Sequence, residues 1–221
     1  MPFRHAIILN TIAKPGQLPS GLCPLYVPGA ADFLGVYPVS SSRLRLPSGT
    51  DSLVFSLEMA IFCELEYGPA GEVEAVVPRM AGAFLGGAVG EAGMKWSIRR
   101  HWGSFCAAVS AEFEVLDRFA PGGVADAWNW KVEVVRDGAC VSAQECAPAR
   151  DYPLFHERFL EWAKFTLNHQ SDHGAFERVG LRLAQAELPM HALITLGALP
   201  VAVELCRGDE VRVGAMRVVV E

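Results

Sequence analysis

The chain has 221 residues, of which 51% are hydrophobic and 20% are charged, and its formal net charge at pH 7 is −6. This composition supplies enough apolar surface for the core of one domain, so we treat residues 1–221 as a single domain. The acidic balance and the lack of any run of Lys and Arg exclude a typical nucleic-acid-binding protein.

No stretch approaches the roughly 20 apolar residues that a transmembrane helix needs, so no membrane partner is expected. Residues 1–9 lack the pattern of a secretory signal. The six cysteines are scattered without a C-x-x-C pair, which is typical of reduced, buried thiols and not of a zinc site. We therefore expect a cytoplasmic protein, and the high apolar content predicts a homodimer.

Residues 14–50 hold much of the proline and serine, which predicts loop with short extended pieces. Apolar residues are interleaved there, so this N-terminal segment (1–50) is expected to pack on the core. The first clear strand is predicted over 53–67, where the odd positions from Leu57 to Tyr67 are apolar and the even positions carry Glu58, Glu64 and Glu66. A turn over 68–71 and a returning strand over 72–77 complete a hairpin.

Small residues fill 80–95, which favours strand plus loop, and a further strand is predicted over 110–118. Residues 128–135 and 140–144 predict a hairpin around 136–139, where Asp137-Gly138 suits a type I′ turn.

One strong helix is predicted over 153–167 from apolar residues at helical spacing, with Asp151 as N-cap and Pro153 in the first turn. A shorter helix is predicted over 174–185, and the final strands over 191–200 and 205–213. Strands and helices do not alternate, so the pattern indicates a β-dominant α+β fold and disfavours a doubly wound parallel sheet.

The order of several short motifs resembles the fumarylacetoacetate hydrolase family. Members of that family end with an I-x-T-G-T-P corner followed by an L-x-x-G-D-x-V strand, and here His191–Pro200 precedes Leu205-Cys-Arg-Gly-Asp-Glu-Val211. Phe55–Cys63 takes the place of the family's Glu-x-Glu strand. The resemblance spans roughly residues 28–218 and is nearest to an uncharacterised bacterial branch with a degenerate metal site. It implies a mixed β-sandwich roll with one or two packed helices.

The resemblance also implies metal chemistry, because family members hold Mg²⁺ or Mn²⁺ with a Glu-x-Glu pair and an Asp and use it to chelate a small oxo-acid. In this chain Ser56 replaces the first Glu and Glu58 keeps the second. The Asp corresponds to Gly86 or, with another placement of the gap, to Glu91. We therefore expect a weakened or absent metal site, with Glu58 and Glu91 as the candidate ligands.

The family's catalytic groups are also only partly matched. The Lys that balances substrate charge corresponds to Arg100, although Lys95 could substitute. The only N-terminal imidazole for the family's His-Glu dyad is His5, which no acid follows two or three residues on.

Each of these residues has a simpler interpretation. Glu58 could belong to a solvated strand face, Glu91 to an exposed loop, and Arg100 to a surface basic patch. His169 and His173 stand four apart, which could suit a metal pair on a helix, but their polar neighbours favour a solvated helix end.

Two functions follow as hypotheses. The first is a Mg²⁺- or Mn²⁺-dependent hydrolase, decarboxylase or tautomerase of a small oxo-acid. The second is a catalytically degenerate family member that acts as a binding or assembly protein without metal.

Overall fold

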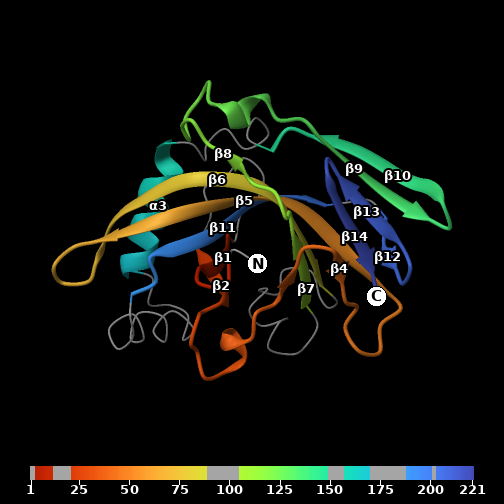
Figure 1. Cartoon of the computed structure of the whole chain (residues 1–221), viewed down its shortest axis with the longest axis horizontal. Helices are drawn as coiled ribbons and strands as arrows, with labels where there is room; N and C mark the ends of the chain where they lie inside the picture. The colour runs from red at the N-terminus through yellow and green to blue at the C-terminus, as the bar shows by residue number, and fades with distance from the viewer. Residues whose placement is uncertain (1–2, 12–20, 89–104, 149–156, 170–187, 201–202) are drawn as a thin grey trace.

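The computed structural model describes residues 3–11, 21–88, 105–148, 157–169, 188–200 and 203–221 (Figure 1). Two sheets dominate these residues. The nine-stranded sheet has the order β2-β1-β11-β5-β6-β7-β3, with β12 added beside β5 and β8 beside β6, and the five-stranded sheet has the order β10-β9-β13-β14-β4. Strands therefore prevail over helix with curled sheets, which confirms the predicted β-dominant α+β class.

The strands of the larger sheet are β1 (Ile7–Thr11), β2 (Leu22–Tyr26), β3 (Val39–Ser40), β5 (Ser52–Tyr67), β6 (Val73–Ala88), β7 (Phe105–Val109), β8 (Glu114–Val115), β11 (His191–Pro200) and β12 (Leu205–Cys206). The smaller sheet contains β4 (Arg43–Leu44), β9 (Trp130–Arg136), β10 (Ala139–Cys146), β13 (Glu210–Val213) and β14 (Met216–Val220). Short 3-10 helices occur at η1 (Phe33–Gly35) and η2 (Val124–Ala127), and the described α-helix is α3 (Glu157–His169).

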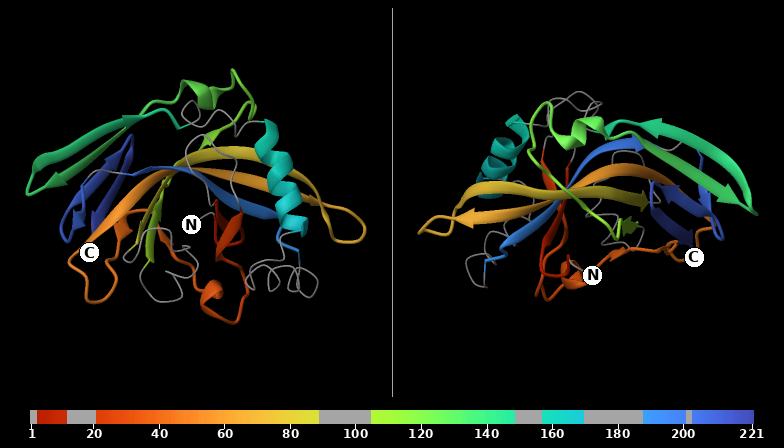
Figure 2. Two further views of the ribbon diagram at one scale, coloured as in Figure 1. Left: turned by 180° about the vertical axis from the view of Figure 1, so that it is seen from behind. Right: turned by 45° about the horizontal axis from the view of Figure 1, so that its top comes forward.

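The hairpin of β5 and β6 runs the length of the larger sheet (Figures 1 and 2). The predicted alternation of β5 is confirmed, because its odd residues lie on one buried face. Leu57 packs in a cluster with the five-stranded sheet, whereas Met59 and Ile61 pack in a second cluster that includes α3. The even face contributes Ala60 to a third cluster. One strand thus joins three apolar clusters, which requires the side chains in its middle, from Leu57 to Ile61, to be apolar or internally hydrogen-bonded.

Helix α3 confirms the predicted helix over the part that the structure describes, while Asp151, Pro153 and the second helix predicted over 174–185 lie outside it. Phe159 and Ala163 are fully buried against the larger sheet. The Asn168 side chain accepts a hydrogen bond from the Val73 amide and donates one to the Val73 carbonyl, both at 2.9 Å, so it fixes the end of the helix to the start of β6. No helix among the described residues has the length and apolarity needed to cross a bilayer.

Two buried strands, β1 and β2, come before the strand that the sequence predicted as the first. β1 lies parallel to β11 and antiparallel to β2, and all residues of both strands are buried. Their short apolar runs become strands only because β11, almost 200 residues later, supplies the partner. The described part of the proline-rich segment is loop with short extended pieces, and Leu34 within it is buried.

The strand predicted over 110–118 is wrong for most of its length. Regular pairing ends at Val109, and only Glu114–Val115 pair again, with β6. The Ser110 hydroxyl donates to the Glu112 carbonyl at 2.7 Å and accepts from the Glu112 amide at 3.3 Å, so a local turn displaces the ladder. The β9–β10 hairpin is confirmed, with φ of 51° at Asp137 and 79° at Gly138, as a type I′ turn requires.

The Gly208-Asp209 turn of the C-terminal motif ties the two sheets together. Gly208 has φ of 90°, which L side chains rarely adopt, and Asp209 is 1% exposed. Its carboxylate accepts two hydrogen bonds of 2.8 Å from Arg136 on β9 and one of 2.8 Å from the Cys206 amide on β12. Burial opposes ionisation of Asp209, but these hydrogen bonds outweigh it and keep its pKa below the usual value.

We predict that Asp209→Asn lowers the free energy of unfolding by about 2 kcal/mol or more at pH 7, because it removes a bidentate, buried acceptor. Since the carboxyl pKa is depressed, this contribution is present above the ordinary value of 3.8 and is lost as the pH falls. In urea unfolding at pH 7, the free energy of unfolding of Asp209→Asn should be well below that of wild type. At pH 3 the difference should be much smaller. Glu210→Gln, at the half-buried pair with Arg212, should change stability by less than about 1 kcal/mol. Equal stability of wild type and Asp209→Asn at pH 7 would refute the role of the turn.

Candidate functional site

The structure describes only part of the predicted site. Glu91, Lys95 and Arg100 fall within 89–104, outside the described residues. His5 is exposed just before β1, and Glu58 lies in the middle of β5, where it is 3% exposed. The simpler interpretation of Glu58, as one residue of a solvated strand face, is therefore wrong.

The imidazole pair is not supported. His169 is exposed in the last turn of α3, where its ring stacks on Phe165 and its Nδ1 lies 3.0 Å from the Phe165 carbonyl oxygen. His173 lies outside the described residues. Within the part of the chain that the structure describes, no group of three or more His, Cys, Asp or Glu side chains could hold a metal ion.

Glu58 is the centre of a buried polar cluster built by three strands. Asn10 on β1 and Thr195 on β11 are directly paired in register, and β11 is in turn paired with β5. The Asn10 Nδ2 group donates to Glu58 Oε2 at 2.8 Å and to Thr195 Oγ1 at 2.6 Å. Ser56 donates from its hydroxyl toward Glu58 Oε1 at 3.3 Å and toward the Gly86 carbonyl at 3.4 Å. The cluster therefore links side chains that are up to 185 positions apart in sequence.

The electrostatics of the cluster favour the neutral acid. Burial raises the pKa of Glu58 to about 8, although the hydrogen bonds of Thr195, Ser56 and Asn10 act in the opposite direction. None of these partners carries a charge, so the desolvation of the carboxylate is not offset by an ion pair. At neutral pH Glu58 is mostly a carboxylic acid that holds one proton.

The described residues do not fit a divalent cation. Ser56, which takes the place of the first carboxylate in the family resemblance, is paired across the strands with Gly86, one of the two candidates for the Asp position, and neither supplies a carboxylate. The other candidate, Glu91, lies outside the described residues. Both oxygens of Glu58 accept hydrogen bonds from neutral donors, which compete with a metal for the same lone pairs. Mg²⁺ prefers several charged oxygen ligands in near-octahedral geometry, and one protonated carboxyl does not supply them.

Sequence reasoning missed Asn10 and Thr195. Asn10 is the polar residue at the end of an apolar run, and Thr195 stands inside the apolar strand β11 with 0% exposure. A polar residue interrupting a buried strand is a signal for a buried hydrogen-bonding partner. Here the signal was unreadable because β1 was not predicted as a strand.

We predict that Glu58→Gln removes a pH dependence of stability. The unfolded side chain ionises near the ordinary value of 4.5, whereas the folded one holds its proton to about 8. Between these values only the unfolded state releases the proton, so wild-type stability falls as the pH rises. Each pKa unit corresponds to about 1.4 kcal/mol, so the free energy of unfolding of Glu58→Gln, relative to that of wild type, should rise by up to a few kcal/mol across this window.

Urea unfolding from pH 4 to pH 9 measures this difference. The amide can accept from Asn10 and donate to Ser56, so the cluster keeps its hydrogen bonds. Glu66→Gln, on the same strand but exposed, is the matched control and should run parallel to wild type. If the difference in free energy of unfolding between wild type and Glu58→Gln stayed constant over the whole pH range, the raised pKa assigned to Glu58 would be contradicted.

The solved structures that are similar to this chain are enzymes whose sequence identity to it is low. A 4-oxalocrotonate decarboxylase from Pseudomonas putida G7, complexed with calcium and acetate, is 12% identical with a TM-score of 0.49 and covers 98% of this chain and 77% of its own. A maleylpyruvate hydrolase from Sphingobium sp. SYK-6 is 17% identical with a TM-score of 0.45, over 97% of this chain and 69% of its own. A 2-keto-3-deoxyarabinonate dehydratase is 8% identical with a TM-score of 0.47, over 97% of this chain and 73% of its own. With all scores below 0.5, these similarities carry no argument about the site residues or the activity of this chain.

No curated protein matches the sequence. A protein-family model does match, over residues 8–204, and that span includes Asn10, Ser56, Glu58, Gly86 and Thr195. The match extends over most of the chain, and the protein therefore belongs to the family of unknown function designated DUF5718.

Proposed function

We propose that this protein is a fumarylacetoacetate hydrolase-like protein that binds a small oxo-acid through neutral hydrogen-bonding groups and does not depend on a divalent metal. The observation that carries the proposal is the state of Glu58, a buried carboxyl whose oxygens accept from Asn10 and Ser56 and whose pKa is raised to about 8. The resemblance of the sequence supplies the ligand class, and the hydrogen bonding of Glu58 argues against the metal.

A neutral carboxyl suits such a ligand better than a carboxylate does. A protonated Glu58 donates one hydrogen bond, and the keto or carboxylate oxygens of an oxo-acid accept it. An ionised Glu58 would repel the ligand's own carboxylate. Ser56 is partly exposed, so its hydroxyl is the member of the cluster that an incoming ligand meets first.

A metal-dependent enzyme is the second candidate. Glu58 keeps the position of one family ligand, and the Ser56 hydroxyl and Gly86 carbonyl place two further oxygens beside it. On this hypothesis Glu91 would complete the shell for Mg²⁺ or Mn²⁺, Arg100 or Lys95 would balance the substrate charge, and His5 would act as base. The activity would be hydrolysis, decarboxylation or tautomerisation of the oxo-acid.

The proposal also includes a cytoplasmic location and a homodimer. All six cysteines are free and four of them are buried, which supports a reducing compartment. The homodimer rests on the apolar composition alone.

Thermal unfolding distinguishes the two candidates. In the presence of EDTA, oxaloacetate or an acylpyruvate should raise the Tm of wild type in a saturable way, and Ser56→Ala should weaken this binding by about tenfold because one hydrogen bond to a charged ligand is lost. Mg²⁺ and Mn²⁺ without ligand should leave the Tm unchanged. Glu66→Gln should behave as wild type in every condition.

Two results would overturn the proposal. A rise in Tm with Mg²⁺ or Mn²⁺ that Glu58→Ala abolishes would establish the metal-dependent candidate instead. No response to either oxo-acid, with or without the metals, would refute oxo-acid binding.

A further inference from the structure

A pocket of about 380 Å³ lies at the β3–β7 edge of the larger sheet, where Arg4 from the segment before β1 and Arg43 from β4 also line it. Val39 on β3 is paired with Ala107 on β7, and both line it. The other described lining residues are Arg4, Tyr37, Pro38, Ser40, Arg43, Arg45 and Cys106. The described lining residues thus include three arginines and no Asp or Glu, in a chain whose net charge is −6.

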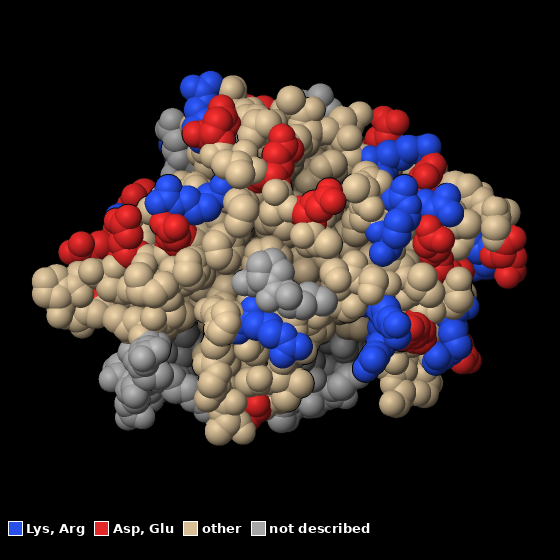
Figure 3. All heavy atoms as spheres, viewed as in Figure 1, with Lys and Arg blue, Asp and Glu red and all other residues tan. Residues whose placement is uncertain are grey.

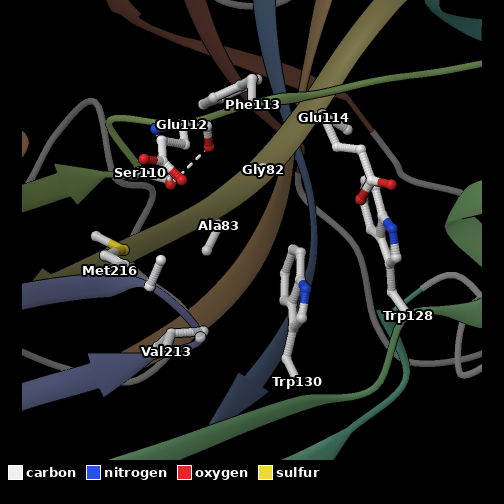
Figure 4. A pocket seen from close by; sticks show the side chains of 13 residues that line it. Gly82, Ala83, Ser110, Glu112, Phe113, Glu114, Trp128, Trp130, Val213 and Met216 are labelled. Atoms are coloured by element: carbon white, nitrogen blue, oxygen red, sulfur yellow. Dashed lines mark hydrogen bonds between the residues drawn. The ribbon is translucent and has the colours of Figure 1, made fainter.

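The concentration of positive charge is local. Basic and acidic side chains are interspersed over the face shown in Figure 3, so no broad positive field covers that face. Another pocket of about 380 Å³, shown in Figure 4, has the opposite character: its lining includes Glu112, Glu114, Trp128 and Trp130, and no described lining residue is basic. Two pockets of equal size therefore differ in the sign of their charged side chains.

Tyr37 brings an unused hydrogen-bonding group to the arginine-lined pocket. Its hydroxyl is buried and has no hydrogen-bond partner in the structure. The Arg4 guanidinium lies 5.0 Å from the centre of the Tyr37 ring, and the Tyr26 ring packs edge-on at 5.1 Å. Burial raises the pKa of Tyr37, while the charge of Arg4 acts to lower it, so the guanidinium influences the ionisation of the hydroxyl. An orphaned buried hydroxyl is destabilising unless an acceptor reaches it.

Arg43 and Arg45 already show that they can hold a carboxylate. Arg43 Nη1 lies 3.0 Å from Glu221 Oε1, and Arg45 Nε lies 3.8 Å from Glu221 Oε2. Both arginines are more than half exposed, so this ion pair contributes little to stability and is readily exchanged for another anion. The guanidinium fork matches the geometry of carboxylates and phosphates alike.

We propose that this arginine-lined pocket binds a small molecule through an oxyanion group, a carboxylate or a phosphate, held by Arg4, Arg43 and Arg45 and by a hydrogen bond from the Tyr37 hydroxyl. The volume suits a metabolite-sized ligand. The site lies across β6 from the Glu58 cluster: its lining residue Ala107 on β7 is two strand spacings, roughly 10 Å, from Ser56 on β5. The inference does not rest on the proposed oxo-acid function.

The test is a titration of the full chain with succinate and, separately, with inorganic phosphate, at an ionic strength held constant with chloride. The Tm of wild type should rise in a saturable way with at least one of the two anions. Saturation with succinate alone would assign a carboxylate ligand, and saturation with phosphate alone a phosphate-bearing ligand. Arg4→Gln should weaken binding by about tenfold or more, because a charge-assisted contact is lost.

Tyr37→Phe separates binding from folding. It removes an unpartnered hydroxyl, so the free variant should be at least as stable as wild type in urea while its affinity for the anion falls about tenfold. Arg212→Gln, which removes an equal charge on the other sheet, should bind as wild type does. The proposal is overturned if neither anion saturates, or if Arg4→Gln and Tyr37→Phe bind with wild-type affinity.

Discussion

Strand β5 constrains the whole molecule, because its 16 residues must satisfy three apolar clusters at once. Its odd face contacts the five-stranded sheet near Leu57 and the α3 region near Met59, and its even face is buried in the middle of the strand, at Glu58 and Ala60. Where both faces are buried, no solvent can accept a misplaced polar group. Every polar side chain in its middle therefore needs a partner within the fold, and the cluster around Glu58 is the result.

The same constraint explains why the cluster differs from a metal centre. A divalent ion offsets the burial of several carboxylates, and without such an ion a group of buried carboxylates would be strongly destabilising. Within the described part of the cluster there is one carboxyl, that of Glu58, beside Ser56 and Gly86, and its donors are neutral. Its raised pKa reflects burial as a neutral acid. The neutral neighbours of Glu58 and its protonation are thus physically consistent with each other.

The charged groups of the described structure are used in two different ways. Arg136 and Asp209 form a bidentate pair that joins β9 to the Gly208 turn, and this pair serves the fold. Arg4, Arg43 and Arg45 line a pocket together with Tyr37, and there the only counter-charge among the described contacts is the exposed pairing of Arg43 and Arg45 with Glu221. The buried pair at the sheet junction stabilises the structure, whereas the exchangeable pairs and the unpartnered Tyr37 hydroxyl around a cavity are features of a binding site.

The sequence by itself determined the elements whose patterns are local. The alternation along 53–67, the Asp137-Gly138 turn and the amphipathic helix were all predictable, because propensity and period act within a few residues. The strands β1 and β2 were not, since their burial depends on β11, and the turn at Ser110 replaced part of a predicted strand by a local hydrogen bond. Glu58 could be singled out from its motif, but only the tertiary structure decided that it is buried and surrounded by Asn10, Thr195 and Ser56. Asn10 and Thr195 come from two strands distant in sequence, and the desolvation that sets the protonation of Glu58 exists only once these strands have assembled with β5.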